Sequence, residues 1–355
     1  MILGCLSTHS RLPLIAVSAR SRILCLAAPL AGAVTMGCSA NLAASSEQTD
    51  AEASAVTAIV TVERTAGSGG SEGVRSDIIA RFVRSRAGDE DALRIVGAAI
   101  DLPAAGACTR LPAANSATKM AHSVELVNVG ALSVELPPQS SGSPSASSGS
   151  APSTSAESRV AGPDYQAKLL PRHLPDVVDL VSGVVYTARA EGDAFPARGR
   201  YVFHAAGAPE QEIAPFTVEA TAKGEPGELR IADQAIARRT DPGPIVLSPA
   251  DSVEITWAQS PDASTEDDLI YIDVSARPAG TSTVRCSFVD NGRATLAATA
   301  FPSDEGTIAV HRVHRESFRA KGIDSGVLRF DFARTSSFRR QATQDPSAAV
   351  QPSRR

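Results

Sequence analysis

The chain has 355 residues, of which 43% are hydrophobic and 4% aromatic, so it carries enough apolar material for a buried core. Lysine and arginine number 34 against 39 acidic residues, which gives a net charge of −5. A mildly acidic surface repels phosphate backbones, and we therefore expect no nucleic-acid partner.

The first forty residues have the layout of an export signal. Arg11, Arg20 and Arg22 supply positive charge, and no acidic residue precedes Glu47. The apolar run at 23–36 has the length of the hydrophobic part of a signal peptide, and it is shorter than the roughly 20 residues that a membrane-spanning helix needs. The sequence therefore predicts that the protein is exported.

Gly37-Cys38-Ser39 follows this run and resembles the lipobox at which bacterial lipoproteins are cleaved and lipidated. The resemblance implies a signal peptide at 1–37 and a lipid anchor on Cys38. Because serine rather than aspartate follows the cysteine, it also implies an outer-membrane or cell-surface location. Thr35 departs from the family, which usually has leucine at that position.

An ordinary secretory signal is the alternative to the lipobox. Such a signal would be cut after Ala40 or Ala44 and would discard Cys38, which would leave a secreted or periplasmic protein. Both alternatives place the protein outside the cytoplasm.

The cysteines predict one disulfide. Cys5 and Cys25 lie within the signal and Cys38 is the lipidation site, so Cys108 and Cys286 remain. Two cysteines in an oxidising compartment are most simply bonded to each other, and a bond that closes a loop of about 180 residues would stabilise the fold by several kcal/mol. The alternative is a pair of separately buried thiols.

Short strands account for most of the chain after a small, polar stretch at 38–54, which we expect to be a flexible tether. Alternation of apolar and polar residues at 56–63 is typical of a half-buried strand. The run at 77–84 also has apolar residues on one helical face, but a strand fits its neighbours better. Further strands are predicted at 93–100, 123–129, 131–136, 179–187, 199–204, 215–220 and 229–231.

Two segments lack the apolar residues that a fold needs. Serine, proline, glycine and alanine dominate 137–163, and the tail at 336–355 is polar. We expect both to be disordered, because they cannot bury enough surface to offset the entropy of ordering. The insertion at 137–163 would interrupt one large domain or separate two small ones.

The clearest strands lie between 252 and 332. The strand at 252–257 carries Trp257 on its apolar side, which predicts a core position for the only tryptophan. Asn291-Gly292 follows the strand at 283–289 and favours a type I′ turn, so the segment 293–298 is predicted to pair back with that strand. The other strands are predicted at 269–274, 307–311 and 327–332. This rhythm predicts an all-β fold, an antiparallel β-sandwich over 55–335.

A strand with Trp257, followed about 30 residues later by a strand with Cys286, resembles an immunoglobulin-like sandwich. The chain departs from that family because Cys108 lies far upstream, and because Asp290 and Gly292 follow Cys286 instead of preceding it.

The layout as a whole is similar to that of bacterial surface lipoproteins from myxobacterial-type genomes. The motifs that carry this likeness are the lipobox, Ala-Arg-Phe at 80–82, Gly-Ala-Cys at 106–108 and Cys-Ser-Phe at 286–288. The resemblance implies a β-sandwich and brings no known activity or functional residues with it.

Catalytic and metal-binding motifs do not emerge from the sequence. His311 and His314 have an i, i+3 spacing, but on a strand such a pair points to opposite faces. No Gly-x-Ser-x-Gly follows a strand, as a nucleophile elbow requires. We therefore expect no enzymatic activity, no catalytic residues, no cofactor and no metal site. The other histidines of the exported chain are His122, His173 and His204.

One acidic cluster is a weak calcium candidate. It comprises Asp262, Glu266, Asp267 and Asp268, whose oxygens are of the kind that Ca²⁺ prefers. Their spacing matches no established calcium motif, and a solvated acidic loop that shields a sheet edge is the favoured interpretation. The arginine-rich stretch at 312–321 is taken as a charge-balanced surface.

These features favour a lipid-anchored protein of the cell envelope, with a non-catalytic interaction or structural β-sandwich. Its expected partners are the membrane, through the anchor, and an envelope protein or glycan. A module that binds a glycan or small ligand is the first alternative, although sugar-binding faces need exposed aromatic rings. An envelope hydrolase is the second.

Overall fold

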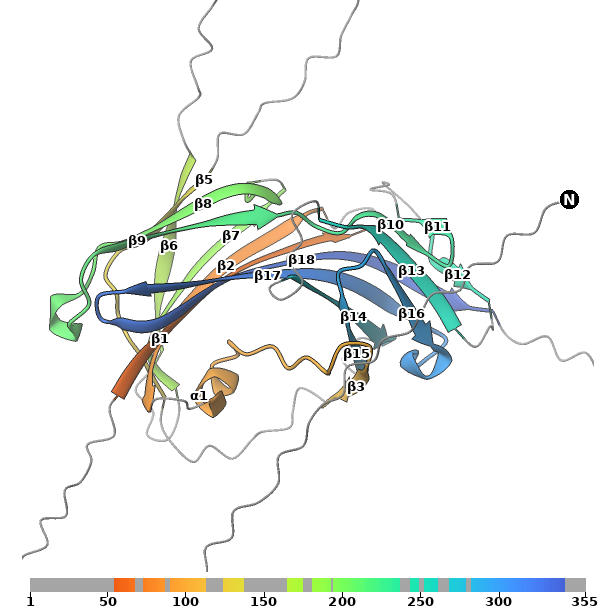
Figure 1. Ribbon diagram of the computed structural model, residues 1–355, viewed down its shortest axis with the longest axis horizontal. Helices are drawn as coiled ribbons and strands as arrows, with labels where there is room; N and C mark the ends of the chain where they lie inside the picture. Colours follow the sequence, from red (N-terminus) through yellow and green to blue (C-terminus); the bar gives the residue numbers. More distant parts are fainter. Residues whose placement is uncertain are drawn as a thin grey trace, which may run out of the picture. The chain divides into compact units, whose positions relative to one another are not determined.

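The computed structural model describes residues 54–67, 73–86, 90–112, 124–136, 165–174, 181–192, 194–236, 243–248, 252–260, 268–278 and 282–341. The described residues belong to one compact unit and form two β-sheets, with the single short helix α1 (Glu90–Ile95) and two turns of 3₁₀ helix at Pro209–Gln211 and Ala298–Ala300 (Figure 1). The all-β expectation is confirmed. The predicted signal peptide, Cys38 and the insertion at 137–163 lie outside the described residues.

The larger sheet has 14 strands, in the order β3-β15-β14-β17-β18-β1-β2-β4-β7-β6-β5-β8-β9, with β12 paired to β18. Strands from the beginning and the end of the chain lie at its centre, where β18 joins β1. The bounds are β1 (Ser54–Gly67), β2 (Arg75–Arg86), β3 (Cys108–Leu111), β4 (Val124–Leu126), β5 (Leu132–Leu136), β6 (Tyr165–Leu174), β7 (Val181–Glu191), β8 (Arg198–Ala205), β9 (Phe216–Lys223), β12 (Ile245–Leu247), β14 (Asp268–Ala276), β15 (Thr283–Val289), β17 (Glu305–Ala320) and β18 (Ile323–Arg340).

The smaller sheet has four strands, in the order β11-β10-β13-β16. They are β10 (Gly227–Ile231), β11 (Gln234–Ala235), β13 (Ser252–Ala258) and β16 (Arg293–Ala297). Its apolar side chains share one core cluster with those of β14, β15 and β17, so this sheet forms a second layer on that part of the larger sheet. Trp257 lies in this cluster, as the alternation in its strand predicts.

The larger sheet is mixed rather than wholly antiparallel. Most neighbours are antiparallel, but β1 with β18, β12 with β18 and β4 with β7 are parallel. Parallel neighbours cannot be joined by a tight turn, and β1 and β18 come from opposite ends of the described chain. Alternation within a strand does not reveal such a pairing, which is why the antiparallel expectation needs this correction.

Two further apolar clusters lie elsewhere in the described chain. The largest contains apolar side chains of β1, β2 and β18, from the middle of the strand order, together with those of β5, β8 and β9, from the end formed by β9, so the middle and one end of the order contribute to one core. The other lies between α1, β4 and the β1–β2 pair, and includes Ile59, Val83 and Ala92. The described residues contain no helix that is long and apolar enough to cross a membrane.

The strand predicted at 93–100 is wrong. The segment forms α1 and an irregular stretch, and Ala92 and Val96, which lie one helical turn apart, are both buried against the β1–β2 pair. A short apolar run fits a buried helical turn as well as a strand, so the pattern alone could not separate them.

The hairpin predicted at Asn291-Gly292 is also wrong. The strand β15 pairs with β14 and β3 in the larger sheet, whereas β16 pairs with β13 in the smaller one. Of the two turn residues only Gly292 has a positive φ, at 84°, and a type I′ turn needs both. The chain here passes from one sheet to the other.

The predicted tail at 336–355 begins too early. The strand β18 continues to Arg340, pairing with β17 and with β12, and Phe338 is buried against Phe301 with ring centroids 5.4 Å apart. Phe332 and Phe338 lie an even number of residues apart, so they fall on the same side of a strand. The residues between them are mostly polar, and the sequence pattern therefore did not indicate that the strand continues.

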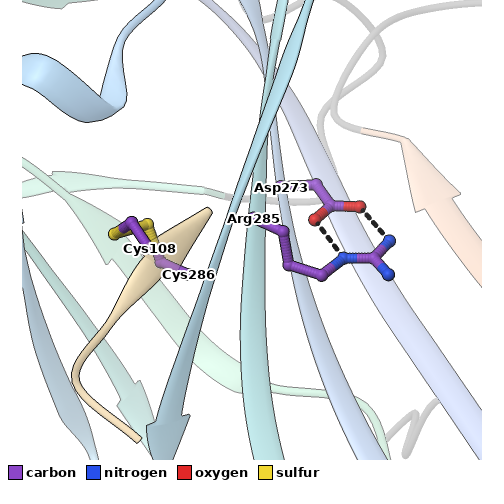
Figure 2. The surroundings of a disulfide bond; sticks show 4 residues. All are labelled: Cys108, Asp273, Arg285 and Cys286. Atoms are coloured by element: carbon purple, nitrogen blue, oxygen red, sulfur yellow. Dashed lines mark hydrogen bonds and ion pairs between the residues drawn. A yellow bond between two sulfur atoms is a disulfide. The ribbon is translucent and has the colours of Figure 1, made fainter. Parts of the chain in front are cut away.

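The two cysteines of the described chain are bonded, Cys108 to Cys286 (Figure 2). They lie directly opposite each other on neighbouring strands, β3 and β15, of the larger sheet. The conserved bridge of immunoglobulin domains joins two facing sheets instead. Here the bridge fastens a four-residue edge strand, whose residues are mostly exposed, to the body of the sheet.

Candidate functional site

A row of polar side chains crosses one face of the larger sheet. We call it the polar row. Its members lie on β15, β14, β17, β18, β1, β2 and β7, and strand alternation brings them to the same face as their register partners. They are Arg285, Asp273, Tyr271, His311, Asp331, Arg329, Glu63, Asp77 and Arg189.

The row begins with a paired arginine and aspartate. Arg285 donates from Nε and Nη2 to the two carboxylate oxygens of Asp273, at 2.8 and 2.7 Å (Figure 2). Its guanidinium also lies 4.6 Å from the ring centre of Tyr271. Two-point pairing and the ring contact both restrict the arginine, so this end of the row is held in one geometry.

Asp331 lies at the centre of the row and binds two neighbours. Tyr271 donates its hydroxyl to Oδ2 at 2.7 Å, and Nδ1 of His311 lies 2.8 Å from Oδ1. The rings of Tyr271 and His311 are stacked, with centroids 4.1 Å apart. The carboxylate and the stacking together fix the orientation of the imidazole.

The pKa values follow from these contacts. Burial of Tyr271, and then the charge and hydrogen bond of Asp331, raise the pKa of the phenol well above its usual value, so the phenol stays a donor. Burial alone would raise the pKa of Asp331, but His311 and the Tyr271 hydroxyl lower it overall. Asp331 is therefore held in its ionised form.

The row continues into an open polar cavity of about 830 Å³. Glu63, the register partner of both Asp331 and Asp77, belongs to the row and to the cavity lining. Asp77 binds Arg189 at 2.6 Å and Arg75 at 3.1 Å. The remaining lining comes from Thr65, Gly67, Gly73, Val74, Glu191, Gly192 and Thr335.

Glu63 is a member of the row whose ionised form is disfavoured, although its side chain is exposed to solvent at the cavity. Desolvation, and then the like charges of Asp331 and Asp77, raise its pKa, while Arg329 and Arg81 lower it. A carboxyl group whose pKa is higher in the folded state favours the protonated form there. The stability of the protein therefore falls as pH rises from the ordinary glutamate pKa through the raised one.

We expect Glu63→Gln to raise the unfolding midpoint at pH 7 and to leave it unchanged at a pH below the ordinary glutamate pKa. The neutral amide removes the charge that the folded state disfavours, and at low pH the native side chain is already neutral. Thermal unfolding of both proteins across this pH range checks the result. An equal gain at every pH would mean that the amide acts through packing and that charge is not the cause.

His311 of the polar row and His204 of β8 are each held by a carboxylate. The partner of His311 is Asp331, and those of His204 are Thr217 and Glu135, at 3.1 and 3.3 Å. His204 therefore lies beside a hydroxyl as well as a carboxylate, whereas the side chain that faces Nδ1 of His311 is a carboxylate.

A second buried cluster joins three strands. His314 lies with Nδ1 at 2.7 Å from Asp268 and with Nε2 at 3.1 Å from Glu316, while Lys223 of β9 binds Asp268 at 3.0 Å. Glu316 also accepts the backbone N–H of Thr221. The cluster fastens β9, the last strand of the sheet order, to β14 and β17.

The weak calcium candidates meet different outcomes. Asp268 is buried and engaged by His314 and Lys223. Asp262, Glu266 and Asp267 lie outside the described residues, as do His122 and Cys38. Among the residues that the structure does describe, no group of three or more histidine, cysteine, aspartate or glutamate side chains could hold a metal ion.

A third cluster was missed by the sequence analysis, which placed Arg312 on the surface. Arg312 is buried and donates from Nε to Asp290 at 2.8 Å, and from Nη2 and Nη1 to the carbonyls of Ala258 and Glu225. Asp290 also accepts the indole N–H of Trp257 at 2.6 Å. The alternation of β17, which puts Arg312 on the side of Ile308 and Val310, was the available signal.

These features define an all-β protein of two sheets, with a polar row that opens into a cavity. No family model matches the chain, and no curated protein matches it. One solved structure with some likeness is that of the Fcho1 Mu homology domain from Danio rerio with bound Eps15 peptide, at 11% identity and a TM-score of 0.21, over 82% of this chain and 100% of that one. A score so low carries no argument about function.

Proposed function

We propose that the protein is an exported, lipid-anchored component of the cell envelope, whose β-sandwich is a non-catalytic interaction or structural module. Two features of the sequence support this proposal: the export signal predicted in the first forty residues, and Cys38 as the predicted site of the lipid anchor. Its location is the outer membrane or the cell surface.

The disulfide is the observation that supports this proposal most strongly. Disulfides persist in oxidising compartments and are rare in the cytosol, where thiols are kept reduced. The bond between Cys108 and Cys286 retains β3 at the edge of the larger sheet, and four residues of backbone pairing provide little attachment of their own. A sheet edge that is held by a disulfide is more stable in an oxidising compartment, where the bond persists, than in the cytosol.

Lipidation is tested by replacing the anchor residue. We expect the wild-type chain to fractionate with membranes and to carry a diacylglyceryl group on Cys38, and Cys38→Ser to lose the lipid and leave the membrane fraction. Mass spectrometry of the mature amino terminus measures the first effect, and fractionation the second. A mature chain that begins beyond residue 38, or full-length protein among soluble cytosolic proteins, would refute the anchor.

Binding of a small polar ligand is the second candidate, and the 830 Å³ cavity favours it because ligand sites have this size. Stacking on sugar rings finds less support, since Trp257, Tyr186, Tyr201 and Tyr271 are all buried. A thermal-shift screen of sugars and small polar metabolites tests this candidate. This candidate is supported only if a ligand raises the unfolding midpoint of the native protein and does not raise that of Glu63→Gln.

A further inference from the structure

A second, apolar pocket lies on β6, away from the polar row. It has a volume of about 510 Å³, and its described lining is mostly apolar, including Leu132, Leu169, Leu170 and Pro171. This volume is within the range of small-molecule sites. We propose that the pocket binds an anionic amphiphile, a molecule with one acyl chain and one carboxylate head. The proposal does not depend on the lipid anchor.

The pocket forms where β6 changes its partner. Residues Tyr165 to Leu169 pair with β5, whereas Leu170 to Leu174 pair with β7. Neither neighbour spans the whole of β6, and the pocket is lined by residues from both halves of β6, from β5 and from the segment 128–131 that precedes β5. The pocket therefore lies at the point on β6 where the strand pairing changes.

The wall at 128–131 is fixed by hydrogen bonds. Asn128 Oδ1 accepts from the Tyr186 hydroxyl at 2.6 Å and from the Gly130 N–H at 2.9 Å, and the Tyr186 oxygen accepts the Val129 N–H. Gly130 has a positive φ of 76°, and a Cβ there would lie 2.3 Å from the Gly207 carbonyl oxygen. A rigid wall lowers the cost of ordering a site around a ligand.

Exposure of apolar surface points to a ligand at this pocket. Leu170 is 66% exposed, against 44% for Val246 and 41% for Val289, the other large apolar side chains that lie exposed in the described chain. A leucine in water gains about 1.5–3 kcal/mol when it is fully buried. An acyl chain seated in the pocket would cover part of this side chain.

The charge of the lining selects the head group. Lys168 and His173 line the pocket, and no acidic residue is among its described lining. Glu135, which lies on the same strand as Ser133 of the lining, contacts His204 instead. A carboxylate at the rim would meet Lys168, whereas a cationic or neutral head would gain no such partner.

Binding of decanoate to the full-length chain tests the proposal, with Cys38→Ser as the background so that no detergent is needed. We expect Leu170→Asp to weaken binding about tenfold or more and Lys168→Glu about fivefold, measured by calorimetry. Val246→Asp, a change of the same kind at an exposed site outside the pocket, is the matched control and should bind as tightly as the background protein. Circular dichroism confirms that each variant is folded.

Four results would overturn the proposal. Decanol, which lacks the charge, could bind as tightly as decanoate. Leu170→Asp could bind decanoate as well as Val246→Asp does. The chain could ignore free decanoate yet associate with phosphatidylglycerol vesicles, which would make the patch a membrane-contact surface. It could also form a dimer that Leu170→Asp dissociates and decanoate does not, which would identify a second copy as the occupant.

Discussion

Asp290→Ala is expected to lower the free energy of unfolding by about 3–5 kcal/mol, because it leaves Arg312 charged and buried without its partner. Both side chains of this ion pair are 2% exposed. The change also removes the acceptor of the Trp257 indole N–H. Asp290 lies where the chain leaves the larger sheet, and it binds Trp257 of the smaller sheet and Arg312 of the larger one. Its loss therefore affects the contact between the two layers.

Denaturant unfolding followed by the fluorescence of Trp257 measures this effect directly, since the chain has only one tryptophan. Glu305→Ala is the matched control. It removes the acid of an exposed ion pair with Arg339 and should cost less than about 1 kcal/mol. A double variant with Arg312→Met should lose less than the sum of the two single changes, because the uncompensated charge is gone. A cost for Asp290→Ala no greater than for Glu305→Ala would show that the pair does not hold the sheets together.

The positions of most strands could be predicted from the sequence, because alternation of apolar and polar residues is a local property. Trp257, Val253 and Ile255 were assigned to one buried side, and they lie in one core. The same local evidence failed at Asn291-Gly292, where the turn residues suit a hairpin but the indole and guanidinium contacts of Asp290 draw the chain toward the other sheet. A tertiary contact there overrides a turn preference.

The polar row could not be predicted, because it depends on which strands are neighbours. Glu63 and Asp331 are register partners although most of the described chain lies between them. Alternation assigns each to a face of its own strand, but it does not reveal that β1 and β18 pair in parallel. His311 was therefore treated as an ordinary histidine, without the carboxylate and the phenol that fix its ring. The disulfide could be predicted from the sequence, because only Cys108 and Cys286 remained to pair once the cysteines of the predicted signal and lipobox were set aside.

Loss of the disulfide is expected to have an effect as large as that of Asp290→Ala. The bond closes a loop with a sequence separation of 178 residues, and the chain-entropy model assigns to such a loop about 5 kcal/mol. The variant Cys108→Ala/Cys286→Ala should lower the free energy of unfolding by about this amount. A change of this size is a large part of the total stability of a typical domain.

The loss should also appear locally. The strand β3 pairs with β15 over four residues, and Gly106 and Ala107 add two backbone hydrogen bonds to Ser287. Without the bond these few contacts hold the edge alone, so amide hydrogen exchange at 106–111 should accelerate more than exchange at the β17–β18 pair.

A reducing agent should reproduce both effects in the wild-type chain and have no effect on the double variant, which has no disulfide to reduce. If the double variant unfolded at the wild-type midpoint, the disulfide would add nothing to the stability of the fold, because the unfolded chain would be equally compact without it. That result would also contradict the argument that β3 needs an oxidising environment. If instead the midpoint fell while exchange at 106–111 stayed slow, the bond would act on the unfolded state alone. The edge strand would then owe its place to backbone pairing.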